Sequence, residues 1–422
     1  MLISGMSGNE IYCLSLKGLS PGEITVGNSV YSIGVTGALG SMGRSISGGE
    51  ITQITQMISD GRHSAIGRME QDAQKHGAQG VSGVTTSLGS LAGFTEFLSQ
   101  GTAVHGTSPS GRFFSTAASG IELYCHLDAG YLPIKFAMGN IAYAIGVGRG
   151  LLGSFRTLAR GEVREFSSMY NEIRHTALAR LRAEASQAGA NAVVDVRVQM
   201  LPYGPGTVEL LLTGTASFHP GLSQGAVPEH QVATSELTGE ELWNLAVLGY
   251  VPHQLVMATS VYSLGVASGI GARFRSLARG EIPEVTKLIY EARENCLELV
   301  RREAQQLGAE HVIGNRLQIR ELSPGLIEVV ALGTAVRRAQ GMEPRTQPLI
   351  PQAVIVDGGS RGTEASISGL SLHSSPMGTA NALTARMGGG AMGGRAIGIF
   401  VFLFVIIVMC LGTLIPLMMS QR

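Results

Sequence analysis

The chain has 422 residues, of which 44% are hydrophobic and only 15% are charged. Lysine and arginine balance aspartate and glutamate at 31 each, so the net charge is zero, which excludes a basic nucleic-acid-binding protein and an acidic disordered chain. The 58 glycines are about twice the average share. Low charge with ordinary hydrophobicity is typical of large buried interfaces, a membrane segment, or both.

A threefold internal repeat extends from near the N-terminus to residue 338. A segment with a central tyrosine recurs at offsets of 112 and then 119 residues, at Tyr31, Tyr143 and Tyr262. The same offsets align three Gly-Glu pairs and three arginines, which are Gly49-Glu50, Gly161-Glu162 and Gly280-Glu281, and Arg62, Arg174 and Arg293. We therefore assign residues 1–106, 119–218 and 238–338 to three copies of one small domain.

Each copy opens with the signature of a short helix. A serine or threonine stands three residues before a glutamate, which is a capping box; the pairs are Ser7 and Glu10, Ser119 and Glu122, and Thr238 and Glu241. A glycine then follows where this helix would end, at positions 18, 130 and 249. The tyrosine-containing segment alternates apolar and small residues, which predicts a strand.

A long helix is the clearest element, predicted in the second copy over residues 162–188 and ended by Gly189. Two strands follow it, at 192–200 and 208–212 in the second copy and at 311–319 and 327–332 in the third. The unit is therefore helix–β–α–β–β, an α+β fold. A three-stranded sheet with one helix on one face leaves its other face uncovered, so we expect each unit to pack against its neighbours.

Two further segments follow the third copy. Residues 339–395 are rich in glycine, serine and proline, which predicts a flexible linker. Residues 396–419 form a stretch of 24 residues without a charge. As a helix this stretch is about 36 Å long, more than the ~30 Å hydrocarbon core of a bilayer, and predicts one transmembrane helix. Arg386 and Arg395 precede it and only Arg422 follows it, which favours cytoplasmic N-terminal domains.

The third copy resembles the YbjQ-like family, small bacterial domains labelled heavy-metal-binding. The resemblance is carried by Gly280-Glu281-Ile282, Ala304–Gly314 and Ala331–Val336, and in the second copy by Tyr170–Arg174 and Ala188–Val194. The first copy is more divergent, because Ile58 replaces the tyrosine. The resemblance implies three tandem dodecin-like βαββ domains of a kind that assembles as homopentameric rings, and it implies no established activity. It also places the transmembrane anchor in a bacterial inner (cytoplasmic) membrane.

The residues themselves do not support a metal or cofactor site. Metal ions need soft or imidazole ligands brought close together, and no such cluster recurs among the copies. Cys13 and Cys125 correspond to each other but align with Asn244 in the third copy, so we expect both to pack as small hydrophobic residues. Residues 148–153 match the spacing of a dinucleotide-binding fingerprint, yet neither sister copy keeps it, so we predict no cofactor.

Charged residues near the repeated Gly-Glu pairs and on the long helices are the candidate functional residues. They are Arg44, Glu50, Arg62, Arg156, Arg160, Glu162, Arg174, Arg275, Arg279, Glu281 and Arg293. Arginines beside a helix N-terminus can bind an anion, or an arginine of one unit can meet a glutamate of the next across an interface. We favour the interface. No Ser/His/Asp, Cys/His or paired-carboxylate arrangement repeats, so we predict that the protein is not an enzyme.

These features together predict a membrane-anchored scaffold whose partners are itself and the lipid bilayer. Three copies on one chain cannot close a five-membered ring alone. The simplest closed arrangement places the same copy of every chain in one ring, which gives three stacked rings that form a hollow cage or tube on the membrane. The alternative is a membrane-tethered oligomer that sequesters metal ions or small ligands, for which tight, stoichiometric uptake would be the sign.

Overall fold

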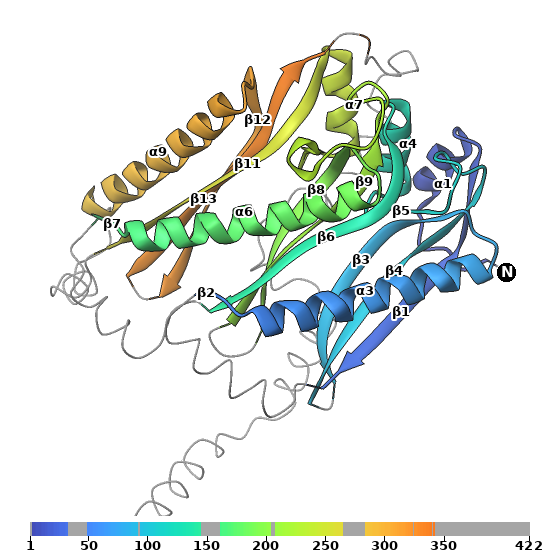
Figure 1. The fold of residues 1–422 in the computed structure, drawn as a ribbon, viewed down its shortest axis with the longest axis horizontal. Helices are drawn as coiled ribbons and strands as arrows, with labels where there is room; N and C mark the ends of the chain where they lie inside the picture. Colours follow the sequence, from blue (N-terminus) through green and yellow to red (C-terminus); the bar gives the residue numbers. More distant parts are fainter. Residues whose placement is uncertain are drawn as a thin grey trace, which may run out of the picture. The chain divides into compact units, whose positions relative to one another are not determined.

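The computed structural model describes residues 2–32, 49–91, 93–144, 161–203, 207–264, 283–323, 325–339 and 341 (Figure 1). The predicted linker lies outside these residues except for positions 339 and 341, and the predicted transmembrane helix at 396–419 lies outside them entirely. Among the residues that are described, no helix combines the length and the apolar character needed to cross a membrane.

Each repeat contains a short helix, a long strand, a long helix and two more long strands. The first repeat comprises α1 (Gly8–Ser15), β1 (Leu19–Tyr31), β2 (Gly49–Glu50), α3 (Thr52–Lys75), β3 (Gly80–Leu91) and β4 (Phe94–Gly106). The second comprises α4 (Gly120–Asp128), β6 (Leu132–Ala144), β7 (Gly161–Glu162), α6 (Arg164–Gln187), β8 (Ala192–Pro202) and β9 (Thr207–Phe218). The third comprises α7 (Gly239–Val247), β11 (Tyr250–Ser263), α9 (Pro283–Gln306), β12 (His311–Ser323) and β13 (Leu326–Arg338). The predicted α+β class with three repeated units is confirmed.

The three short helices begin at the predicted capping boxes. In each, the side chain of the cap residue accepts a hydrogen bond from the backbone N–H of the glutamate three residues later, and that glutamate accepts one from the N–H of the cap residue. This exchange satisfies amides that would otherwise be unpaired at a helix N-terminus. Gly130 follows α4 with a φ of 91°, a left-handed conformation that lets the chain leave the helix and enter β6.

The long helix of the second repeat starts two residues later than predicted. It begins at Arg164, because Gly161 and Glu162 form the two-residue strand β7. β7 pairs with β11 of the third repeat, so its conformation depends on a distant part of the chain that no local pattern reveals. The helix ends at Gln187, one residue before the predicted end, and Gly189 follows its cap residue Ala188.

The long strands of each repeat form an antiparallel sheet with the last strand in the middle. The strand orders are β1-β4-β3, β6-β9-β8 and β11-β13-β12. Residues between the repeats add β5 (Phe114–Ser115), parallel to β3, and β10 (Ala233–Thr234), parallel to β8, with the short 3₁₀ helix η1 (Glu229–Gln231) just before β10. In addition β2 joins β6 and β7 joins β11, so the second and third sheets each receive an edge strand from the preceding repeat.

One face of each sheet, here called the inner face, is covered by the long helix of the same repeat (Figure 1). Close approach depends on glycine: a Cβ on Gly139 of β6 would lie 2.2 Å from the carbonyl oxygen of Ala177 in α6. The Ser29 hydroxyl of β1 likewise donates a hydrogen bond to the Gly61 carbonyl of α3 at 2.7 Å. The opposite face of the sheet, the outer face, is left to other partners.

Neighbouring repeats contact each other side by side. Helix α3 of the first repeat packs on β6 of the second, and α6 of the second packs on β11 of the third. The predicted arrangement, in which the three repeats of one chain occupy three separate stacked rings, is therefore wrong for the repeats within a chain. The outer faces of the second and third sheets, which their own helices leave uncovered, bind the long helix of the preceding repeat. This contact removes apolar surface from water.

Two glycines of α3 allow a test of how closely this helix packs. A Cβ on Gly61 would lie 2.3 Å from a ring atom of Phe97, whereas a Cβ on Gly67 would have no atom within 4 Å. Gly61→Ala should lower the free energy of unfolding by about 1–3 kcal/mol through overpacking. Gly67→Ala should raise it by about 0.5–1 kcal/mol, because alanine favours the helix. Denaturant unfolding of both variants measures the difference, and effects of the same sign would contradict this packing.

Candidate functional site: the contact between successive repeats

The long helices α3 and α6 each have a second apolar face, which covers the outer face of the next sheet. In the first contact, Ile66 and Met69 of α3 cluster with Phe136, Met138 and Leu211 of the second repeat. In the second contact, α6 packs on the outer face of the third sheet, at residues that include Leu255, Met257 and Val261. α3 and α6 therefore each serve two sheets, their own and the next one.

The starts of α3 and α6 also form hydrogen bonds with the first long strand of the next repeat. The Thr55 hydroxyl accepts a hydrogen bond from the Ala142 N–H at 2.9 Å, and the Ile51 N–H donates to the Ala142 carbonyl at 2.8 Å. The second contact repeats both bonds at 2.9 and 2.8 Å, with Ser167, Val163 and Val261 in the equivalent positions. These bonds pair part of a strand edge that would otherwise be open.

Glu50 and Glu162 lie in the short strands that enter the next sheet. β2 carries Glu50 onto β6, and β7 carries Glu162 onto β11. Arg180 of the second repeat donates to both carboxylate oxygens of Glu50, at 2.9 and 3.0 Å, so this ion pair crosses the first contact. Glu162 instead lies 3.8 Å from Arg164 of its own repeat.

Arg62 and Glu209 form a buried ion pair across the first contact. Nε and Nη2 of Arg62 donate to the two carboxylate oxygens of Glu209 at 3.1 and 2.7 Å, and neither side chain has exposed surface. Nη1 of Arg62 donates to the Thr86 hydroxyl, and Asn140 donates to Glu209 at 3.4 Å. A two-bond pair of this kind is directional, so it holds the helix and the sheet in one relative position.

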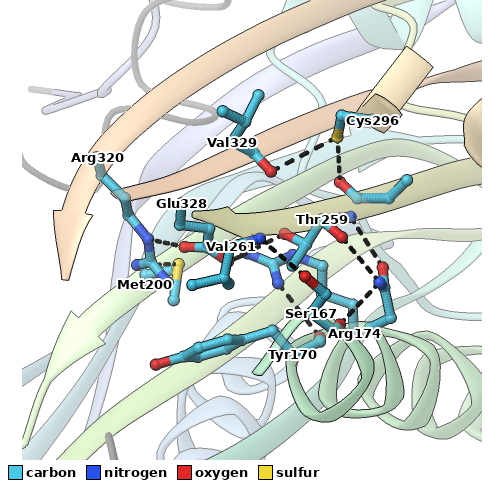
Figure 2. A network of polar contacts seen from close by, with 12 residues as sticks. Ser167, Tyr170, Arg174, Met200, Thr259, Val261, Cys296, Arg320, Glu328 and Val329 are labelled. Carbon is cyan, nitrogen blue, oxygen red and sulfur yellow. Dashed lines mark hydrogen bonds and ion pairs between the residues drawn. The ribbon is translucent and has the colours of Figure 1, made fainter. Parts of the chain in front are cut away.

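Arg174 and Glu328 form the equivalent pair across the second contact (Figure 2). Nη2 of Arg174 donates to Glu328 at 2.8 Å, the Thr259 hydroxyl donates to the same oxygen at 3.0 Å, and Arg320 donates to the other oxygen. Burial by itself raises the pKa of the Glu328 carboxyl, but the guanidinium groups of Arg174 and Arg320 outweigh it and hold that pKa below its ordinary value. Glu328 therefore stays charged at neutral pH.

The short helices form a second line of contacts between repeats. Glu10 caps α1 and also accepts a hydrogen bond from the Gly120 N–H at the start of α4, at 3.3 Å. Asp128 at the end of α4 binds Lys17 of the first repeat at 2.6 Å and the indole N–H of Trp243 in α7 at 2.7 Å. Helices α1, α4 and α7 are thus joined in chain order.

The structure brings several of the sequence-derived candidates to these contacts. Arg62, Arg174 and Glu50 take part in ion pairs between repeats, and Glu162 lies in the strand that joins the third sheet. Arg293 occupies the position on α9 that corresponds to Arg62 and Arg174, and its side chain is exposed. The remaining candidates lie outside the described residues: Arg44, Arg156, Arg160, Arg275, Arg279 and Glu281.

The carboxylate partners Glu209 and Glu328 were missed from the sequence. They are 119 residues apart, which matches the repeat offset, but position 97 of the first copy, 112 residues before Glu209, is a phenylalanine. The strand register identifies the missing member as Glu96, because Glu96 faces Val30 across β4 and β1 as Glu209 faces Ala142. In the first copy this glutamate lies one residue before the position given by the repeat offset, so a comparison at a fixed offset does not find it.

The described part of the chain offers no metal site. No group of three or more His, Cys, Asp or Glu side chains there is placed to hold an ion. Cys13 is half-buried and Cys125 is buried, and burial, reinforced by Glu240, raises the pKa of both thiols. Burial also raises the pKa of Cys296 to about 12, and its thiol donates to the Ala258 carbonyl at 3.2 Å. Thiols held in the neutral form are poor metal ligands.

The two buried ion pairs should differ in what their loss costs. Among the described residues, Glu209 without Arg62 keeps one long hydrogen bond, from Asn140, whereas Glu328 without Arg174 keeps Arg320 and Thr259. Arg62→Met should therefore lower the free energy of unfolding by about 3–5 kcal/mol, and Arg174→Met by clearly less.

Chemical unfolding of the two variants tests this order. Adding Glu209→Gln to Arg62→Met should restore most of the lost stability, because the double variant leaves no unpaired buried charge. An Arg174→Met variant as unstable as Arg62→Met would show that Arg320 does not compensate.

Comparison with known proteins agrees with the threefold repeat. The sequence pattern of the YbjQ family, described as "Putative heavy-metal-binding", matches residues 20–107, 133–219 and 238–339. An encapsulin nanocompartment protein of Mycobacterium tuberculosis is 31% identical over 238 residues, which are 53% of this chain and 88% of that protein. No solved structure matches the chain.

Single-domain relatives match one repeat at a time. The UPF0145 protein of Thermotoga maritima is 40% identical over 91 residues, which are 22% of this chain and 81% of that protein. The UPF0145 protein of Thermosipho melanesiensis is 38% identical over 79 residues, or 19% of this chain and 73% of that protein. Because the family pattern recurs in all three repeats, this chain belongs to the YbjQ family of UPF0145 proteins and carries three tandem copies of its domain.

Proposed function

We propose that this protein is a scaffold that assembles with further copies of itself through its YbjQ repeats. One observation carries the proposal: the same contact, an arginine-bearing helix on a glutamate-bearing sheet, forms twice within the chain. A contact that joins two different surfaces of one unit can be continued by covalent neighbours or by separate chains. The similarity to a protein named as an encapsulin nanocompartment protein supports a role in a compartment-like assembly.

The proposed role is structural and not enzymatic. The arginines and glutamates that the fold buries between repeats are used by one another, Arg62 by Glu209 and Arg174 by Glu328. Groups paired in this way hold neighbouring repeats in one relative position, and they are not free to bind or protonate a substrate. Their positions between repeats favour assembly over catalysis.

The scaffold is proposed to be attached to a bacterial inner membrane through residues 396–419, with its repeats in the cytoplasm. The support comes from the sequence: 24 uncharged residues, preceded by two arginines and followed by one. Anchors in one membrane would hold the repeats of different chains close together, which raises their effective concentration for one another.

The assembled mass of the full chain tests the proposed function. In mild detergent at micromolar concentration, sedimentation or mass photometry should give species whose protein mass is a multiple of 44.2 kDa. A metal chelator should leave these species unchanged, because the contacts are made by protein groups. Monomers alone would contradict the scaffold, and dispersal by the chelator would favour the metal-sequestering alternative.

Membrane attachment is tested separately by deletion of residues 396–422. The full chain should stay with membranes after high-salt and alkaline washing, and the deletion variant should be released, because no helix among the described residues is long and apolar enough to span a bilayer. Deletion of the equally long linker segment 355–381 is the matched control and should leave the chain attached. A deletion variant that remains bound to membranes would contradict the anchor.

A further inference from the structure

The first sheet has the outer face that the second and third sheets bury. Ile24, Val26 and Val30 of β1 are 45%, 47% and 49% exposed. Their counterparts in β6 and β11 are nearly inaccessible: Phe136 2%, Met138 3%, Ala142 0%, Leu255 0%, Met257 1% and Val261 0%. β1 alternates buried and exposed residues, so only its inner face is covered, by α3. A surface buried twice in this chain is thus present a third time, without a cover among the described residues.

Helix α9 has the complementary outer surface. Its positions Thr286, Tyr290 and Arg293 correspond to residues of α6 that bind the third repeat, and all three are exposed. The corresponding residues of α6 are Ser167, Asn171 and Arg174, which contact Val261, Thr259 and Glu328 respectively. α9 packs on its own sheet through the other face, where Leu288, Ala292 and Cys296 are buried.

The charges of the two surfaces match as well. Glu96 occupies on the first sheet the position of Glu209 and Glu328, because it faces Val30 as they face Ala142 and Val261. Glu96 is half-buried on that face, and Arg293 is exposed on α9. Within the described part of the chain, no ion pair involves either residue, whereas each of the four counterparts is paired.

The contacts between the short helices independently show that this side of the first repeat has no neighbour among the described residues. A Cβ on Gly120 would lie 2.7 Å from Glu10 of the preceding helix, and one on Gly239 would lie 2.7 Å from Glu122. The corresponding position in the first repeat is Gly8, where a Cβ would meet nothing within 4 Å. Within the described residues, both lines of contact between repeats therefore stop at the first repeat.

We propose that a second copy of this chain supplies the missing neighbour: α9 of one copy packs on the outer face of β1 and β4 of the next, with Arg293 paired to Glu96. This inference rests on the proposed self-assembly and specifies its interface. The contact is head-to-tail, so chains continue into a closed ring or an open filament in which the first, second and third repeats alternate. Rings built from one kind of repeat, as expected from the sequence, are replaced by this mixed order.

One position makes the contact between copies weaker than the contacts within a chain. In the first internal contact Nε2 of His63 lies 3.3 Å from Oε1 of Glu184, and Nζ of Lys135 lies 2.6 Å from the same oxygen. The corresponding residues across the contact between copies are Glu294 and Asp72, both acidic. Two carboxylates at this place repel each other, so association between copies is reversible while the internal contacts persist.

Charge reversal at Arg293 and Glu96 tests the proposal on the full chain in detergent. Arg293→Glu and Glu96→Arg should each raise the concentration at which half of the chains are assembled by at least about tenfold. The double variant should regain assembly, because the pair is restored with its charges exchanged. Lys287→Glu is the matched control: it lies exposed on the same helix, and its counterparts Gln56 and Ser168 are exposed even within the internal contacts.

The outcomes separate the interface from the proposed function. If the wild-type chain is monomeric, the scaffold itself is wrong. If it assembles and Arg293→Glu behaves like Lys287→Glu, the scaffold stands and this interface is wrong.

A second measurement does not depend on the charges. Thr55 of α3 lies against Ala142 of β6, so the equivalent pair between copies is Thr286 and Val30. Chains that carry both Thr286→Cys and Val30→Cys should form a ladder of covalent oligomers on oxidation. Each single variant, and the pair Lys287→Cys with Val30→Cys, should not. Absence of the ladder in an assembled Thr286→Cys/Val30→Cys chain would overturn the interface.

Discussion

The outer face of the three-stranded sheet is the constraint on which the rest of this structure depends. A helix can cover only one face of a sheet, so each repeat buries its inner face by itself and cannot bury the other. The long helix of the preceding repeat covers this face at the second and third sheets, where Phe136 and Leu255 become inaccessible to water. The repeats therefore depend on one another for their cores, as in other repeat proteins whose units contact mainly their neighbours.

The buried arginine–glutamate pairs fix how these faces meet. Apolar contact alone permits a helix to slide or turn on a sheet, and apolar replacements of a buried ion pair are often as stable. A carboxylate such as Glu209, with no exposed surface, is tolerated only when Arg62 is aligned with it. A slip of one residue in β9 would turn the carboxylate to the inner face, away from Arg62. We infer that these pairs select one register among several apolar contacts of similar energy.

The elements of each repeat could be predicted from the sequence, and the contacts between repeats could not. Capping boxes and apolar periodicity are local signals, so the short helices and most of α6 follow from them. The local sequence places Glu162 in the helix, but it lies in the strand β7. That strand forms by pairing with β11, far away in the chain. Glu96 cannot be found by comparing the repeats at a fixed offset, since only the strand pairing shows which residue faces Val30. Non-local pairing, which sequence spacing does not encode, accounts for both differences.

Covalent linkage explains why the same contact can be permanent inside the chain and reversible between chains. A linker of a dozen or so residues holds neighbouring repeats at an effective concentration of about millimolar, so even a weak contact forms. The outer face of the first sheet and the exposed surface of α9 have no such covalent link, so their contact depends on its own affinity. Their exposed aliphatic residues, Ile24 and Val26, are smaller than Phe136 and Met138, and the Glu294–Asp72 position is repulsive. The divergence of the first repeat thus places the weakest contact where one chain meets the next, which keeps the chain as the unit that is added to or lost from the assembly.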